Sequence, residues 1–468
     1  MDDCHPPRHI ARVTTAASFG FALVQLDVTI VNVALPHMAA TLHAGVAGLQ
    51  WVVDAYALAF AVLLLSMGYL GDRLGARRVY LGGMLLFALA SVWCGTSVDA
   101  AMLIAGRTLQ GVAAAAMLPC SLALLSHATA HEHALRARAV GWWTASGAIS
   151  IAAGPIVGGL LLSVASWRSI FLVNVPVCAL GAWLTWRVQE TERKVRAGRF
   201  DWPGLLLAVL ALTGLTIAVI EAKPMGWTHP LVLACAALAV MAALGFVRVE
   251  SQRAAPMLPL RFFKAPGFSA AVAYGVIVNL TYYGMVFLLS LYMQRVHGYS
   301  ALRTGLAYLP LTATFFGVNI FSGWLVGRVG ARWPMVLGAL IDAAGFALFL
   351  LLDAGSPYLL MLPAFALLPL GMGLGVPAMT TSVLTAVEKH AAGTASGVLN
   401  AARQAAGAMG VALFGALAGE SDARIVQGMH RSAWMAIGLL LLAAMLALWG
   451  MAAAPARAHV DAATDQAG

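Results

Sequence analysis

The stretch LDVTIVNVALP, residues Leu26–Pro36, places a carboxylate, Asp27, and an amide, Asn32, inside the first long apolar segment of the chain. That segment runs from about residue 10 to residue 36, so Asp27 lies roughly 14 Å from its end at the helical rise of about 1.5 Å per residue. This depth is close to the middle of a bilayer, where an ionised side chain costs on the order of 3 kcal/mol to insert. Such a residue either marks a pathway or proton relay or pairs with a fixed basic partner, and both alternatives stay open for Asp27.

Composition places the chain among helical membrane proteins. Of its 468 residues 61% are hydrophobic and 10% are charged, and the mean hydropathy is +0.85, whereas soluble domains carry about 25% charged residues. The formal net charge of +9 does not indicate a nucleic-acid partner, because the basic residues sit in short loops rather than in patches interleaved with aromatic residues.

The apolar segments follow a six, two, six pattern. It predicts an all-α membrane protein with 14 transmembrane helices in three parts. Residues 1–188 form an N-terminal six-helix bundle, residues 189–264 a linker with two extra spans, and residues 265–468 a C-terminal six-helix bundle with a short cytoplasmic tail. The expected spans are 10–36, 50–71, 79–96, 101–126, 139–164, 169–188, 202–220, 228–247, 267–293, 302–326, 333–352, 357–386, 392–418 and 432–453.

The distribution of basic residues predicts that both termini are cytoplasmic. With that orientation, twenty of the 28 Lys and Arg residues lie on the cytoplasmic side and six on the other, while Arg107 and Arg403 lie within spans. Cytoplasmic loops generally carry this excess of positive charge. If one span were miscounted, every later loop would change sides and the excess of positive charge on one side would disappear. The same distribution therefore supports the count of fourteen spans.

A short repeat links the two halves. Residues Arg73–Arg77 read RLGAR, residues Arg328–Arg332 read RVGAR, and a glycine, Gly68 or Gly323, stands five residues before each. Both copies follow the second span of a six-span block, which favours a duplicated half over chance. Two such halves around a midplane site are the layout of alternating-access transporters.

Three motifs of the first half resemble the major facilitator superfamily. GYLGDRLGARR, Gly68–Arg78, resembles the loop between its second and third helices. LIAGRTLQG, Leu103–Gly111, resembles its helix-four motif. GAISIAAGPIVGG, Gly147–Gly159, resembles the helix-five motif of its antiporters.

Three further stretches are similar to the fourteen-helix branch of drug:proton antiporters in that superfamily. They are LDVTIVNVALP, WRSIFLVNVP at Trp167–Pro176 and NAARQAAGAMG at Asn400–Gly410. Within the branch, Asp54 in WVVDAY and the sequence VLNAARQ most resemble the methylenomycin-resistance type of exporter.

The resemblance implies that Arg107 takes part in proton coupling, and the depth of Asp27 in its span predicts that this carboxylate carries the proton. An arginine in a span keeps its proton and needs an acceptor, and Asp27, Asn32 and Gln110 are the candidates in the same half. Burial favours the neutral carboxyl and an approaching guanidinium favours the ionised one, so a change in their separation would load and release a proton. A fixed buried ion pair is the alternative.

Other polar residues in the spans have less defined roles. Arg403 and Gln404 match the branch pattern and are expected to support coupling or substrate binding, with ordinary packing as the alternative. Asp54 could attract a cationic substrate, and Asp342 is either a second titratable group or an exposed residue near the interface. The aromatic residues that could line an amphiphile pocket, unless they pack in the core or face lipid, are Tyr56, Trp142, Tyr274, Tyr282, Tyr283, Phe287 and Phe316.

The helix-five motif is expected to shape how the halves close. Pro155 removes a backbone donor, and Gly154, Gly158 and Gly159 permit close helix contact, so this helix should be kinked and tightly packed. Gly147 begins the motif. The resemblance implies that it favours export, and ordinary small-residue packing is the alternative.

A cytoplasmic gate is expected where spans two and three meet. A carboxylate, guanidinium groups and helix ends can form a latch there that differs between two conformations, besides setting the topology. The second copy has Gly327 in place of Asp72, so the latch is expected in the first copy only. The gate residues are Gly68, Asp72, Arg73, Gly75 and Arg77.

No enzyme signature is present. The sequence lacks the GxxxxGK[ST], HExxH and GxSxG motifs, so ATP-driven transport and hydrolysis have no chemical basis. The five cysteines are scattered and indicate neither disulfides nor a zinc site. Residues 131–133 read HEH, which is interpreted as a polar loop rather than a metal site. No cofactor or metal is expected.

The sequence thus predicts proton-coupled efflux of small amphiphilic drugs or antibiotics across a bacterial inner membrane. The expected partners are the substrate, protons and the lipid bilayer, and the expected functional unit is a monomer. An uptake symporter is an alternative, which the Gly147–Gly159 motif argues against. A polytopic sensor or channel is another, and it would show no proton-linked counterflow.

The orientation is directly testable with reporters fused after Gly468. A reporter that is active only in the cytoplasm should be active there, because the charge distribution places the C-terminus inside. Activity of a periplasm-specific reporter at the same position would refute the arrangement of fourteen spans with both termini inside.

Overall fold

The computed structural model describes residues 6–129, 133–188, 201–253, 256, 258–387, 392–419 and 421–451. Every regular element in these residues is a helix. The first half contains α1 (Pro6–Leu42), α2 (Val46–Leu74), α3 (Ala76–Gly95), α4 (Ala100–Ala128), α5 (His133–Val164), α6 (Ser169–Leu172) and α7 (Asn174–Trp186). Two helices, α8 (Trp202–Met225) and α9 (Pro230–Gln252), and a 3₁₀ turn, η1 (Leu260–Lys264), follow. The second half contains α10 (Pro266–Leu291), the π-helical η2 (Tyr292–Val296), α11 (Ala301–Ala307), α12 (Leu309–Val329), α13 (Arg332–Phe349), α14 (Tyr358–Thr385), α15 (Ala392–Leu417) and α16 (Asp422–Gly450).

The count of membrane spans agrees only in part with the predicted fourteen. In the described residues 12 helical segments are long and apolar enough to cross a bilayer, and the bent helix α5 raises the number to 13. The remaining predicted span is α15, which is not among them. Its sequence carries Asn400, Arg403 and Gln404 among many small residues, which lowers its hydropathy.

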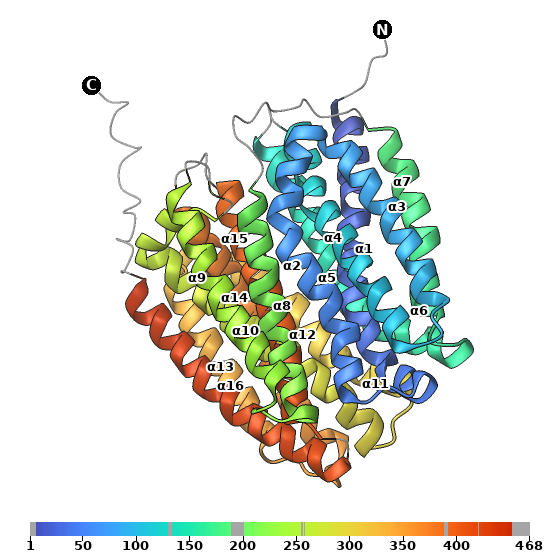
Figure 1. The fold of residues 1–468 in the computed structure, drawn as a ribbon. Coiled ribbons are helices and arrows are strands. Elements are labelled where there is room, and N and C mark those ends of the chain that lie inside the picture. The colour runs from blue at the N-terminus through green and yellow to red at the C-terminus, as the bar shows by residue number, and fades with distance from the viewer. Residues whose placement is uncertain are drawn as a thin grey trace.

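The helices pack as two bundles that lie side by side (Figure 1). In the first, α1 packs on α5, and α4 packs on both α2 and α3. In the second, α10 packs on α15 and α16, and α14 packs on α12 and α13. The bundles meet where α2 faces α15 and where α5 faces α11 and α12. One buried apolar cluster crosses this boundary, with Ile30 and Leu49 from the first bundle and Phe287 and Val411 from the second.

The two copies of the sequence repeat have the same local structure. Gly75 joins α2 to α3 at φ 100°, and Gly330 joins α12 to α13 at φ 77°. In each, the glycine N–H donates to the carbonyl oxygen four residues earlier. Only glycine adopts positive φ at little cost, which explains why this residue stands in both copies. The shared geometry supports duplication of the half.

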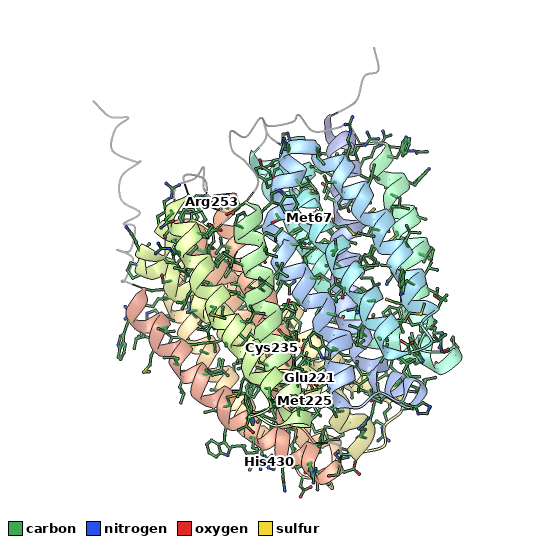
Figure 2. All side chains as sticks on the ribbon, in the orientation of Figure 1. Met67, Glu221, Met225, Cys235, Arg253 and His430 are labelled. Atoms are coloured by element: carbon green, nitrogen blue, oxygen red, sulfur yellow. The ribbon has the colours of Figure 1, made fainter. Side chains whose placement is uncertain are left out.

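The helix α8 lies in the seam between the bundles, where it contacts α2 and α15 (Figure 1). The indole of Trp51 on α2 donates to the carboxylate of Glu221 on α8 over 3.2 Å, and Glu221 is labelled in Figure 2. In contrast, α9 packs mainly on α8, and Arg253 at its end forms a 3.1 Å salt bridge with Asp201 at the start of α8. Of the two helices in the predicted linker, α9 thus lies outside the bundles, whereas α8 touches both.

The turn at Gly75 generates a stability prediction. Gly75→Ala should lower the free energy of unfolding by about 1–3 kcal/mol, because a side chain is strained at this φ. The measurement is the thermal loss of folded protein in detergent. Gly82→Ala is the matched control, because that position in α3 has open space around it. This substitution should leave the free energy of unfolding unchanged or raise it. Equal effects of the two changes would contradict the argument.

Candidate functional site

The two charges predicted to act together form a buried ion pair. Nη1 of Arg107, on α4, lies 2.5 Å from Oδ2 of Asp27, on α1. The side chains are 1% and 0% exposed. The pairing explains how both charges are tolerated in an apolar bundle, because a buried charge requires an opposite charge and hydrogen bonds around it.

Further polar groups complete the hydrogen bonds of the pair. Arg107 donates to Oε1 of Gln110 over 2.8 Å and to the carbonyl oxygen of Val52 over 3.0 Å. The amide of Asn174 donates to Oδ1 of Asp27 over 3.0 Å, and the amide of Gln110 reaches the same oxygen at 3.4 Å. Both carboxylate oxygens of Asp27 therefore accept hydrogen bonds, as a buried carboxylate requires.

Aromatic rings cover the guanidinium of Arg107. Its central carbon lies 4.3 Å from the ring centroid of Tyr56 and 5.8 Å from that of Phe171. Ring faces attract a cation, and the attraction is stronger where water is excluded. Four helices and the short α6 therefore converge on this ion pair: α1, α2, α4 and α7 through hydrogen bonds, and α6 through Phe171.

Three members of this network were not predicted. Asn174 lies at the start of α7, and Ser91 and Cys94 lie on α3. The amide of Gln110 donates to Oγ of Ser91 over 2.8 Å, and the thiol of Cys94 donates to Oε1 of Gln110 over 3.4 Å. Asn174 could have been identified from the sequence, because it is an asparagine within an apolar span and lies in the WRSIFLVNVP stretch.

A small midplane cavity lies beside Arg107, between the bundles. Its volume is about 30 Å³, room for roughly one water molecule, whereas drug-sized ligands need about 300–1,000 Å³. This conformation is therefore closed around the site. The predicted residues Asn32, Tyr56, Tyr283, Gln404 and Arg107 line the cavity, together with Val28, Val53, Ala57, Phe60, Gly407, Ala408 and Val411.

Polar contacts close the boundary between the bundles on one side of this cavity. Gln50 of α2 donates to the carbonyl oxygen of Ala412 on α15 over 2.6 Å. Gln294 donates to the carbonyl oxygen of Val33 over 2.9 Å, and Ser290 donates to that of Asn32. These contacts lie towards the end of the bundle at which α1 finishes, which the predicted orientation places outside.

The helix-five motif takes part in the same closure. The axis of α5 bends by 42° between Ala145–Ile151 and Ala153–Val164, as expected where Pro155 lacks the N–H that would bond to Ile151. A Cβ on Gly154 would lie 1.9 Å from Oγ1 of Thr29, and one on Gly159 would lie 2.8 Å from Cα of Leu302 in the second bundle.

The other glycines of the motif fit the same close packing. A Cβ on Gly158 would lie 3.0 Å from Ile30, and one on Gly147 would lie 2.0 Å from Phe21. The motif thus fixes α5 against α1 on one face and against α11 on the other. This is the tight packing that the sequence predicts.

The predicted cytoplasmic gate lies within the first bundle. Arg77 donates to the carbonyl oxygen of Trp186 over 2.5 Å and to that of Thr185 over 3.3 Å, at the end of α7. A cation at a helix C-terminus is favourable. Gly68 packs against Pro119 of α4. Asp72 and Arg73 lie at the end of α2, and their role in a latch stays a prediction.

The remaining polar candidates do not all reach the cavity. Asp54 is fully buried in α2, and neither carboxylate oxygen has a hydrogen-bond partner in the described part of the chain. It is therefore not presented to a cationic substrate in this conformation. Arg403 lies against Gly275 of α10, and its Nε has no partner among the described residues.

The aromatic candidates divide between the cavity, the core and the surface. Only Tyr56 and Tyr283 line the midplane cavity. Tyr274, Tyr282 and Phe287 are packed in buried clusters. Trp142 is 66% exposed and borders a groove of about 770 Å³ between α1, α5 and α7. The side chain of Phe316 and residues 131–132 of the HEH cluster lie outside the described residues.

The contact at Gly154 generates a prediction about transport. Gly154→Leu should leave membrane insertion intact and abolish efflux, because the side chain would overlap Thr29 and separate α5 from α1. Efflux from cells that express equal amounts of protein is the measurement. Gly438→Leu is the matched control, because nothing lies within 4 Å of that position on α16. Normal efflux by Gly154→Leu would show that the motif has no special role in transport and contributes only ordinary helix packing.

Comparison with known proteins gives a consistent set of matches. Residues 17–411 match the model of the Major Facilitator Superfamily. The chain is 37% identical to the methylenomycin A resistance protein of Streptomyces coelicolor over 452 residues, which cover 96% of this chain and 94% of that one. It is 39% identical to the multidrug resistance protein Stp of Mycobacterium tuberculosis over 402 residues, 86% and 74% of the two chains.

The fold is similar to that of solved transporters. The nucleoside transporter NupG superposes with a TM-score of 0.67 at 12% identity, covering 95% of this chain and 100% of that one. At this identity the likeness concerns the fold alone.

Proposed function

Because the chain belongs to the major facilitator superfamily and to its drug and antibiotic exporters, we propose that it expels small amphiphilic antibiotics in exchange for inward-moving protons. Membership makes it a transporter rather than an enzyme. The energy source in this proposal is the proton gradient. The relatives are named for resistance to methylenomycin A and to multiple drugs, which makes methylenomycin A the first substrate to test.

The observation that carries the proposal is the position of Arg107 between a carboxylate and the cavity. The guanidinium binds Asp27 on one side and lines the midplane cavity on the other. When Asp27 is ionised, the attraction holds Arg107 away from the cavity. When Asp27 takes up a proton, that attraction is lost and Arg107 is free to move into the space that a substrate needs.

Proton and substrate would therefore compete through one side chain. An inward proton neutralises Asp27, the released Arg107 and its neighbours Asn32 and Gln404 reorganise the cavity, and the substrate leaves on the outside. Release of the proton on the inside restores the ion pair, and the cavity can then open for the next substrate. Competition of this kind is what antiport requires, because each ligand must favour a different state.

The glycine contacts between the bundles would allow the interface to adopt two discrete arrangements, open and closed, during this cycle. Close-packed interfaces rearrange between discrete states rather than deforming continuously. The contacts of Gly159 and Gln50 close the cavity on one side, and the cytoplasmic gate around Asp72 and Arg77 would act on the opposite side. An uptake symporter or a sensor has no comparable support from the relatives.

The topology belongs to the same proposal. Counting α15 gives fourteen spans, with both termini cytoplasmic in an inner membrane, and the two bundles correspond to residues 1–188 and 265–468 with the linker 189–264 between them. A monomer suffices, because both bundles and the cavity belong to one chain.

Asp27→Asn tests the proton-coupling role. The variant keeps size and polarity but cannot titrate, so it should fold, bind methylenomycin A more weakly, as the protonated wild type would, and lose efflux driven by a proton gradient. The measurement is uphill movement of labelled methylenomycin A, with proton counterflow, in vesicles under an imposed gradient. Asp353→Asn is the matched control, because Asp353 lies exposed in the loop after α13 and should not affect coupling. Wild-type coupling in Asp27→Asn would show that the assignment is wrong.

Arg107→Lys tests the guanidinium separately. Lysine carries the same charge but lacks the planar fork that reaches Asp27, Gln110 and Val52 at once, and it deprotonates more readily in an apolar site. We expect proton-driven efflux to fall at least tenfold, which corresponds to about 1.4 kcal/mol. Unchanged efflux in the same vesicle assay would show that a point charge is enough.

A further inference from the structure

The second bundle contains a buried carboxylate that the exchange at Asp27 does not use. Asp342, on α13, is 1% exposed, so it is not an exposed residue near the interface. Neither of its carboxylate oxygens has a hydrogen-bond partner in the described part of the chain. The sequence left its role open, and the proposed cycle at Asp27 and Arg107 gives it none.

Glycines hold this carboxylate in the crossing of α13 and α14. A Cβ on Gly371 would lie 2.6 Å from Cβ of Asp342, and one on Gly338 would lie 2.6 Å from the carbonyl oxygen of Gly371. The two backbones are therefore in direct contact. No space for a counter-ion remains on this side of Asp342.

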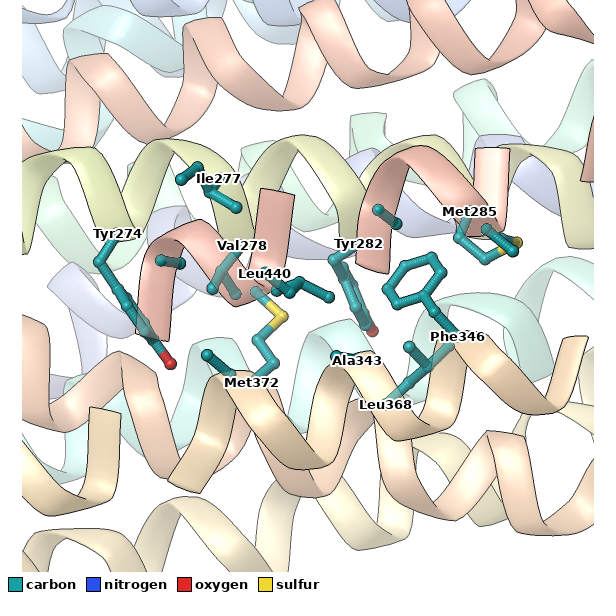
Figure 3. Packing of buried hydrophobic residues seen from close by; sticks show 14 of the residues in the cluster. Tyr274, Ile277, Val278, Tyr282, Met285, Ala343, Phe346, Leu368, Met372 and Leu440 are labelled. Atoms are coloured by element: carbon teal, nitrogen blue, oxygen red, sulfur yellow. The ribbon is translucent and has the colours of Figure 1, made fainter. Parts of the chain in front are cut away.

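A second unpartnered group lies one helical turn away in the same crossing. The hydroxyl of Tyr274, on α10, would be 2.1 Å from a Cβ on Gly375 and 3.1 Å from one on Gly338, and it also has no hydrogen-bond partner among the described residues. Gly338 and Asp342 are four residues apart on α13, about 5–6 Å between neighbouring turns. Figure 3 shows Tyr274 and Tyr282 pointing from α10 towards the helices that carry Ala343 and Met372.

The helices around Asp342 bring no cation to it. From α10 the titratable side chains are tyrosines, and α14 has none apart from Tyr358 at its start. The basic residues of the neighbouring helices lie near helix ends: Arg328 on α12, Arg332 on α13, and Arg424, His430 and Arg431 on α16. His430 is bound to the carbonyl oxygen of Leu352. Within the described residues no salt bridge involves Asp342.

A carboxylate with no donor and no cation is very unfavourable in an apolar interior, and the group remains neutral instead. We propose that Asp342 is a second proton-binding site of the transporter, occupied in this conformation and emptied when the α13–α14 crossing opens to water. The O–H bond then breaks and the proton passes to water. This inference rests on the proposed antiport and extends it, because an export cycle would then move two protons.

Infrared spectroscopy of the purified protein tests whether the proton is present. At neutral pH the wild type should show the C=O stretch of a protonated carboxylic acid, and Asp342→Asn should remove that component. Asp353→Asn, at an exposed loop carboxylate, should leave it unchanged. A spectrum that Asp342→Asn does not alter would mean that the group is ionised and would overturn the proposal. Asp342→Ser, which is smaller, gives the same comparison if asparagine disturbs the packing.

Proton counting in vesicles tests whether this proton is transported. With methylenomycin A as substrate, the ratio of protons to substrate should fall from two in the wild type to one in Asp342→Asn, with transport retained. An unchanged ratio in a variant that has lost the infrared component would make Asp342 a structural neutral acid and overturn the proposal. Wild-type vesicles with no proton counterflow would refute the proposed antiport itself, and the infrared comparison would still decide whether Asp342 holds a proton.

Discussion

The organisation of the first bundle depends on the requirement that the charge of Arg107 be balanced in an apolar interior. The guanidinium satisfies it with Asp27 from α1, Gln110 from its own helix and the carbonyl oxygen of Val52 from α2. Asn174 of α7 completes the shell of Asp27. Removing one partner of a buried pair leaves the other uncompensated, at a cost of about 3–5 kcal/mol. The same interaction therefore positions four helices.

The boundary between the bundles is built from different chemistry. Gly159 on α5 and Gly305 on α11 bring backbones into contact, and a few hydrogen bonds such as that from Gln50 to Ala412 close one side of the cavity. Such contacts contain no buried ion pair, so their separation does not leave an unpaired charge in the membrane. In this account the proton binds at the ion pair. The glycine interface between the bundles then opens or closes according to whether the pair is intact.

Sequence motifs predicted the residues of the ion pair and the kink at Pro155, because a charge or a proline in an apolar span has few physical explanations. They did not predict Ser91, Cys94 or Asn174, since small polar residues in a span satisfy themselves in many ways and only the fold shows which faces meet. For the same reason the sequence did not show the burial of Asp54 and left that of Asp342 open. The span α15 was predicted from its position in the pattern, whereas its many small and polar residues leave its apolar character weak.

The central claim is that the position of Arg107 depends on the protonation of Asp27, and that proton binding and substrate binding therefore exclude each other. The most direct measurement is the number of protons released, over a range of pH values, when methylenomycin A binds to purified protein in weakly buffered detergent. The account predicts that binding releases protons from the wild type and that Asp27→Asn binds the compound while releasing fewer protons, by the share that Asp27 contributes. Equal proton release by the two proteins at equal occupancy would contradict it.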